Sequence, residues 1–368
     1  MGLLSYRALN VWLPSYVGWL ARRPPRRSRP VHLLVAICDH FEPFPQRRDP
    51  EAAQRRVDEW VRLYPEIASC HTDSDGRHPR HTWFYPWDEY HPGALDALFG
   101  LESLGFGEVE LHLHHDGDTS ESLRDKLEQA KEALSRHAGA PRRTFGFIHG
   151  NWALDNSLPG GRWCGVNNEL QVLAEAGCYA DFTFPSLCAS QPRQINSIYY
   201  ATDDPDRPKS YDRGRPARVG GMPDGDLLLV QGPLALDWRR RRRGLFPAIE
   251  SGELSVDNLP SPRRTDVWVN VGVRVLGRPE WIFIKLHTHG GNDRNAAMLL
   301  GGELLERLWS DLEARYNDGE RYMLHYVTAR EMYNLAKAAE AGAPGPPEVH
   351  RDYAVPPYRA PGESHAAH

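Results

Sequence analysis

The stretch VELHLHHDGDTSE, residues 109–121, is the most informative part of the chain. Up to His114 it alternates apolar and polar side chains, which is typical of a β-strand. Gly117 interrupts the alternation, and the polar residues from Asp118 to Ser120 are of the kind that begin a helix. The stretch therefore predicts a strand that turns directly into a helix, which is the building unit of α/β folds.

This junction is rich in side chains that bind metal ions. Three histidines and two aspartates fall within residues 112–118. Ligands of α/β folds bind at the carboxyl ends of the strands, and His and Asp are ligands of Zn²⁺ and similar ions. His114 and Asp118 are spaced to reach one ion from the two sides of the turn, although Asp118 with Glu121 also fits a helix-capping pair. We therefore predict a metal site here, with capping as the alternative.

Composition limits the kind of protein. The chain has 368 residues, 40% hydrophobic and 25% charged, as expected of a soluble globular protein with one large domain or two smaller ones. A net charge of -5 gives no electrostatic reason to expect nucleic-acid binding. Seventeen histidines and eleven tryptophans suit a sugar-binding site, although many tryptophans belong to cores. Five cysteines without a CxxC pair indicate a reduced protein, so we expect a cytoplasmic location.

The first thirty residues form a separate segment. Residues 3–20 are apolar but interrupted by Arg7 and Pro14, and a basic, proline-rich stretch follows. This pattern fits neither a signal peptide nor a membrane span. We predict a helix packed on the domain and then a linker. The alternative is an amphipathic segment, with Trp12 beside arginines, that makes peripheral contact with an anionic membrane face.

The rest of the chain alternates strands and helices, which predicts parallel strands and one barrel-like domain over residues 31–341. The proline-rich tail, residues 342–368, is predicted to be disordered. Residues 190–226 are predicted to be a long loop near the site, and five consecutive arginines at 239–243 a solvated face. The predicted strands are 31–39, 81–87, 109–114, 143–149, 179–184, 227–231, 266–275, 281–286 and 322–327.

Four motifs occur in a recognisable order: ICDHF (37–41), ELHLHHDGD (110–118), GFIHGNW (146–152) before the helix 169–177, and IKLH (284–287). This order resembles the polysaccharide deacetylases with a NodB-type domain, carbohydrate esterase family 4. The resemblance covers most of residues 31–341, but each motif diverges from the family pattern. It implies an α/β fold, a distorted (β/α)₇-like barrel with parallel strands and the site at the strand carboxyl ends.

The resemblance also implies roles for residues of the first two motifs. In one alignment Asp39 is the general base and His40 a metal ligand; in the other Asp39 is the ligand and Cys38 takes the position of the base. The second motif implies that His114 and Asp118 are ligands, with an aspartate where the family has histidine. Both residue types bind divalent ions, so metal-binding capacity is retained.

The later motifs imply the remaining roles. His287 would protonate the leaving group as a catalytic acid. Trp152 would wall the acyl pocket, although it fits a core position equally well, and His287 and His289 also fit structural histidines. The candidates for substrate binding are Glu42, His149, Asn151, Trp152 and His289.

The function implied is metal-dependent deacetylation of an N- or O-acetylated sugar in polysaccharide or glycolipid metabolism. The ion would be Zn²⁺, with Co, Ni and Fe as alternatives. The pairs His112-x-His114 and His287-x-His289 also fit another barrel metal hydrolase, such as an amidohydrolase or phosphoesterase. A glycoside hydrolase using Asp39 with a second carboxylate, and a non-catalytic carbohydrate-binding protein, are further alternatives.

Overall fold

The computed structural model describes residues 3–21, 30–44, 49–242, 246–301 and 304–358. Its central sheet has the strand order β11-β1-β2-β3-β4-β5-β8-β6-β7, and β12 also pairs with β1. All ladders from β11 to β8 are parallel, as is that of β12, whereas β6 and β7 are antiparallel. The chain is therefore an α/β protein with a mostly parallel central sheet.

The strands of the central sheet are β1 (Val31–His40), β2 (His81–Pro86), β3 (Gly107–Leu113), β4 (Phe145–His149), β5 (Cys178–Asp181), β6 (Ile198–Ala201), β7 (Arg215–Pro216), β8 (Leu227–Val230), β11 (Trp281–Thr288) and β12 (Tyr322–Tyr326). A separate hairpin is formed by β9 (Ala235–Arg242) and β10 (Phe246–Glu250), so the first four residues of the arginine run lie in a strand. The α-helices are α1 (Leu9–Ala21), α2 (Pro50–Ala68), α3 (Pro92–Ser103), α4 (Ser120–Ala138), α5 (Glu169–Glu175), α6 (Pro262–Val271), α7 (Asp293–Ala296), α8 (Leu304–Tyr316) and α9 (Ala329–Glu340).

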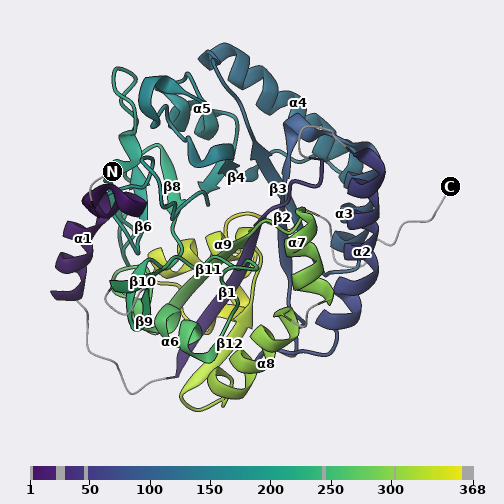
Figure 1. The fold of residues 1–368 in the computed structure, drawn as a ribbon, viewed down its shortest axis with the longest axis vertical. Helices are drawn as coiled ribbons and strands as arrows, with labels where there is room; N and C mark the ends of the chain where they lie inside the picture. The colour runs from purple at the N-terminus through teal and green to yellow at the C-terminus, as the bar shows by residue number, and fades with distance from the viewer. Residues whose placement is uncertain (1–2, 22–29, 45–48, 243–245, 302–303, 359–368) are drawn as a thin grey trace.

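The strand β1 is the centre of the sheet. Its sequence, VHLLVAICDH, is nearly continuously apolar, and its last eight residues are buried, as expected for a strand covered on both faces. It pairs with β11 along one edge, while its first half pairs with β12 and its second half with β2 on the other. Figure 1 shows α2, α3 and α4 together on one side of the molecule and β9, β10 and α1 on the opposite side.

Helix starts follow local sequence signals. The Asp49 side chain accepts a hydrogen bond at the start of α2, and Pro50 occupies its first turn. The capping box of α4 is made by Thr119 and Ser122, not by the predicted pair of Asp118 and Glu121. Asp118 is thus not the helix cap and has other partners.

Residues 266–275 are not the predicted strand, because α6 occupies Pro262–Val271. The valines at every second position mimic a strand pattern. Ser261 caps a helix start before them, and Gly272 ends the helix in the left-handed conformation with φ 59°. The cap and the terminator outweigh the alternation. After β11 the chain forms α7, a π-helical turn at Ala297–Gly301, and α8.

The tail does not follow the prediction of disorder over residues 342–358. This segment contains a short helix, η8 (Pro347–His350), and Val355 and Arg351 are buried. Asn334 of α9 donates to the carbonyl oxygens of Arg351 and Val355. Residues 359–368 lie outside the described residues.

The N-terminal helix packs against the domain, as the preferred interpretation of the sequence predicts. Trp12 and Tyr16 of α1 are buried within a hydrophobic cluster that also includes strand residues of the sheet. The basic stretch 22–29 lies outside the described residues. Across the helices of the described ranges, none has the length and apolar character required of a membrane span.

Between β8 and β11 the described residues contain no direct ladder. The segment after β10 covers the edge of β11 instead: the His287 N–H donates to Gly252 and the Leu254 N–H donates to His287, at 3.1 and 2.8 Å. Lys285 of β11 donates to the carbonyl oxygen of Phe184, after β5, at 2.7 Å. Hydrogen bonds of β11 therefore reach the segment after β10 and the segment after β5.

Candidate metal site at the strand ends

Polar side chains from three strands meet at the carboxyl edge of the sheet. His40 ends β1, His112 lies near the end of β3, and His289 follows β11. The parallel register aligns these ends, with Asp39 of β1 opposite Thr288 of β11. Because parallel strands end at the same edge, residues far apart in the sequence are brought into one site.

Five residues form what we call the Glu42 cluster: His40, Glu42, His112, His114 and His289. Glu42 Oε1 lies 3.0 Å from His112 Nε2 and 3.5 Å from His114 Nε2. The rings of His40 and His289 stack with centroids 4.8 Å apart. Potential ligand atoms of His40, Glu42 and His289 lie within 4.8 Å of one another, as do those of Glu42, His112 and His114. Glu42 is thus the carboxylate shared by two sets of imidazoles.

The surroundings of the Glu42 cluster favour an ionised carboxylate on Glu42, and they shift the pKa values of His40 and His114 in opposite directions. Burial alone would raise the pKa of Glu42, but hydrogen bonds from His112 and His114 hold it well below its usual range. Burial, together with the neighbouring His289 and His112, holds the pKa of His40 well below its usual range. Burial would also lower the pKa of His114, but Asp88 and Glu42 raise it to about 10. Asp88 also fixes the ring of His114 by contacting Nδ1 at 3.2 Å.

A cavity of about 320 Å³ borders the Glu42 cluster. Its lining includes His287, His289 and Trp152, with Ser251 and Glu253 from the segment after β10. Trp152 is half-buried, and its ring centroid lies 5.8 Å from those of His40 and His289. Burial, with Lys285 and His289, holds the pKa of His287 well below its usual range, so this imidazole is neutral near pH 7. Trp152 therefore lines a cavity beside the cluster, in contrast to the alternative core position.

Asp39 is fully buried and both of its oxygens are occupied. Oδ1 accepts from the Gly290 N–H at 2.6 Å, and Oδ2 lies 2.9 Å from His81 Nε2. A Cβ on Gly290 would lie 2.2 Å from Asp39 Oδ2, so the loop that carries His289 approaches Asp39 as closely as a glycine allows. Asp39 thus links the end of β1 to the loop after β11.

His114 and Asp118 do not face one another. His114 contacts Glu42 and Asp88, whereas the Asp118 carboxylate accepts from Lys126 Nζ at 2.6 and 2.8 Å and lies 3.0 Å from His115 Nδ1. The predicted pairing of these two residues on one ion is therefore not found in the described part of the chain. The two side chains therefore contact different groups.

Asp118 belongs instead to the surroundings of a second group, which we call the Glu169 cluster: His115, His149, Cys164 and Glu169. All four side chains are buried, and one potential ligand atom from each lies within 4.8 Å of the others. His149, predicted to bind substrate, is a member of this cluster. Asn151, also predicted to bind substrate, follows His149 by two residues and is half-buried, with a left-handed backbone, φ 56°.

Sequence reasoning missed His81, Asp88, His115, Cys164 and Glu169. The adjacent histidines of the HHD run were a signal that two sites were present, because neighbouring side chains at a strand end point in different directions. Cys164 and Glu169 gave no such signal. One is an isolated cysteine and the other lies at the start of a helix.

A third group, Asp73, Asp75 and His325, lies elsewhere and already has a cation. Arg351 Nη2 is 2.6 Å from Asp75 Oδ2 and 3.3 Å from Asp73 Oδ2. Its guanidinium neutralises the two carboxylates, so this group is a structural ion-pair network.

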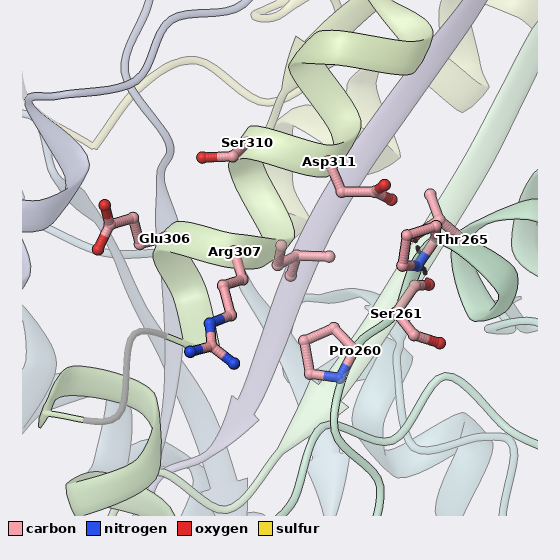
Figure 2. Close-up of a pocket in the computed structure, with 9 residues that line it drawn as sticks. Pro260, Ser261, Thr265, Glu306, Arg307, Ser310 and Asp311 are labelled. Atoms are coloured by element: carbon pink, nitrogen blue, oxygen red, sulfur yellow. Dashed lines mark hydrogen bonds between the residues drawn. The ribbon is translucent and has the colours of Figure 1, made fainter.

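A surface cavity of about 410 Å³ lies between the start of α6 and the exposed face of α8 (Figure 2). Its lining includes Pro260, Ser261, Glu306, Arg307 and Asp311. Its lining contains neither histidine nor cysteine, in contrast to the cavity beside the Glu42 cluster.

No protein-family model matches the chain, and no curated protein matches it by sequence. Among solved structures it is similar to a candidate polysaccharide deacetylase from Mycobacterium smegmatis, with a TM-score of 0.43, 15% identity and coverage of 88% of this chain and 94% of that one. It is also similar to a candidate glycoside hydrolase/deacetylase from Parabacteroides distasonis, with a TM-score of 0.43, 12% identity and coverage of 86% of this chain and 71% of that one. A 4-alpha-glucanotransferase from Thermococcus litoralis has a TM-score of 0.43 and 13% identity, with coverage of 82% of this chain and 40% of that one. Similarity at this level does not assign an activity.

Proposed function

We propose that the protein is a metal-dependent hydrolase that removes an acyl group, most simply acetyl, from a carbohydrate. The observation that supports this proposal is the Glu42 cluster, in which one carboxylate and four imidazoles converge beside a cavity of about 320 Å³. A catalytic zinc site needs three protein ligands of these types and an open side toward the substrate.

The residues fit a divalent ion. His40 Nε2 is buried and has no hydrogen-bond partner among the described residues, which is costly for a polar atom unless a ligand completes it. His112 and His114 already direct Nε2 at Glu42. We therefore assign the ion to Glu42, His40 and His289, with His112 and His114 holding the Glu42 carboxylate in place.

When bound, a divalent ion at this position would polarise an acyl carbonyl and make water more acidic. The proton transfers fall to His287. Its Nδ1 is buried and has no hydrogen-bond partner among the described residues, and the ring is neutral near pH 7. A neutral imidazole can accept a proton from water and pass it to the leaving group. Asp39 is a positioning residue in this proposal, because both of its oxygens already accept from His81 and Gly290.

The carbohydrate class rests on two supports. Trp152 offers an apolar ring on the wall of the cavity, and aromatic rings stack well on sugars. The motif order of the sequence, residues 37–41 to 284–287, resembles the polysaccharide deacetylases. Neither support identifies the sugar.

The test is release of acetate from N-acetylated and O-acetylated oligosaccharides by the purified protein supplied with Zn²⁺ or Co²⁺. We expect turnover by the wild type, loss of activity and of the ion at the Glu42 cluster in His40→Ala, and unchanged metal content with about 10²–10⁴-fold lower activity in His287→Gln. His78→Gln, in the loop before β2, is the matched control and should leave activity unchanged.

Three outcomes would overturn the proposal. Release of reducing sugar without acetate would indicate a glycoside hydrolase. Tight sugar binding without turnover by the metal-loaded protein would indicate a binding protein. Full activity of His287→Gln would remove His287 from the chemistry.

A further inference from the structure

The Glu169 cluster carries an inference separate from the proposed hydrolase site. His115 Nε2 lies 3.1 Å and His149 Nε2 lies 3.4 Å from Glu169 Oε1, and Cys164 Sγ lies 3.3 Å from Glu169 Oε2. Zn–N and Zn–O bonds of about 2.1 Å and a Zn–S bond of about 2.3 Å separate the ligand atoms of a tetrahedral site by about 3.3–3.8 Å. The two histidine separations from Oε1 are close to that spacing, as is the separation of the Cys164 sulfur from the second oxygen of the same carboxylate.

The tautomer of His149 leaves a lone pair inside the cluster. Nδ1 lies 2.5 Å from the carbonyl oxygen of Gly150, which can only accept, so Nδ1 carries the proton. Nε2 is then unprotonated, buried and without a hydrogen-bond partner among the described residues. It faces a carboxylate oxygen of Glu169, and two lone pairs at 3.4 Å repel unless a cation lies between them.

His115 lies between the carboxylates of Asp118 and Glu169. Its Nδ1 lies 3.0 Å from Asp118 Oδ2, and the Asp118 carboxylate is held by Lys126 and Ser122. Nδ1 is out of line for a hydrogen bond to Asp118, whereas Nε2 lies within hydrogen-bond distance of Glu169 Oε1 and so points into the cluster. Asp118 is therefore a charged neighbour of this cluster, held in place by Lys126 and Ser122.

The connection between β4 and α5 folds around the same cluster. Asp118 N–H donates to the Cys164 carbonyl at 3.0 Å, and Asp155 N–H donates to Glu169 Oε2 at 2.5 Å. Asn156 N–H donates to the thiol sulfur of Cys164 at 3.2 Å. Asp155 and Asn156 both have left-handed backbones, with φ 53° and 52°. Such conformations are unfavourable for non-glycine residues and persist where the surroundings hold them.

We propose that His115, His149, Cys164 and Glu169 bind a structural Zn²⁺ ion. One thiolate, two imidazoles and one carboxylate are the ligand types that zinc takes, and four buried protein ligands make the closed shell of structural sites. The site shares no ligand with the Glu42 cluster. The ion ties the end of β3 to the connection that carries Trp152, and so fixes one wall of the substrate cavity.

The proposal is tested with Co²⁺ as the probe metal, in protein produced in cobalt-supplemented medium. A thiolate bound to Co²⁺ gives a charge-transfer absorption in the near ultraviolet, whereas imidazole and carboxylate ligands do not. We expect this band in the wild type and in His40→Ala, because the Glu42 cluster contains no cysteine. The band should be lost in Cys164→Ser and kept in Cys178→Ser, which alters a buried cysteine outside both clusters.

Metal content separates this site from the hydrolase site. We expect about two ions per chain in the wild type and about one in His40→Ala and in Cys164→Ser. Absence of the thiolate band from cobalt-loaded wild type, or its persistence in folded Cys164→Ser, would overturn the proposal. If Cys164→Ser does not fold, the wild-type spectrum and the metal content of His40→Ala decide alone. Loss of acetate release with the thiolate band intact would count against the hydrolase and not against this site.

Discussion

Asp39→Asn distinguishes a positioning role from a catalytic one. The Asp39 side chain is 0% exposed and accepts from the Gly290 N–H at 2.6 Å and from His81 Nε2 at 2.9 Å. Hydrogen bonds to a charged group contribute about 1.5–3 kcal/mol each, against about 0.5–1.5 kcal/mol for neutral ones. Asparagine retains neutral partners at best, so we expect a loss of about 2 kcal/mol in the free energy of unfolding.

The assay is thermal and urea unfolding of the metal-loaded protein, with metal content measured on the same samples. A loss of about 2 kcal/mol corresponds to a decrease of roughly 2–3 °C in Tm for a chain of this size. Metal content should fall as well, because Gly290 directly follows His289. Asp58→Asn, on the exposed face of α2, is the control and should change stability by less than about 0.5 kcal/mol.

A catalytic role for Asp39 predicts a different result for the same substitution. If Asp39 is the general base that the sequence motif implies, Asp39→Asn should lower kcat about 10²–10⁴-fold with unchanged Tm and unchanged metal content. That outcome would refute the positioning argument. Gly290→Ala provides an independent check, since its Cβ would lie 2.2 Å from Asp39 Oδ2 and should destabilise the same contact.

Three further predictions concern other parts of the structure. Gly150→Ala should weaken metal binding at the Glu42 cluster at least tenfold, because the new Cβ would lie 2.2 Å from His114 Cδ2. Competition with a chelator measures this affinity. The control is Gly100→Ala in α3, where the new Cβ would meet no atom within 4 Å and should slightly stabilise the protein. Burial lowers the pKa of Lys285 from 10.5 to about 8, so the charged lysine destabilises the folded state below pH 8, and this penalty disappears as the pH rises toward 10.5. The free energy of unfolding of Lys285→Met, relative to the wild type, should therefore be about 2 kcal/mol more favourable to the variant at pH 7 than at pH 10. A difference that stays constant with pH would contradict this prediction. Asp49→Ala should cost about 1 kcal/mol in urea unfolding, because it removes the N-cap of α2, and an unchanged midpoint would show that the cap does not contribute.

Local signals in the sequence were sufficient for most of the fold. The apolar run that ends at Asp39 predicts a strand buried on both faces, and β1 is one. Alternating strands and helices predict parallel ladders, which the sheet has from β11 to β8. Prediction failed where two local signals competed, as over residues 266–275, and where order depends on distant partners, as in residues 342–358 with Asn334.

The sequence by itself determined which chemical groups stand at the strand ends, because strand periodicity and turn residues place His40, His112 and His114 there. Only the tertiary structure decided how they are divided. His114 and His115 are adjacent in the chain but face different carboxylates, Glu42 and Glu169, which lie far along the chain from them. Metal ligands must converge within a few ångströms, and that convergence depends on the register of the sheet and the path of its connections, which no local pattern encodes.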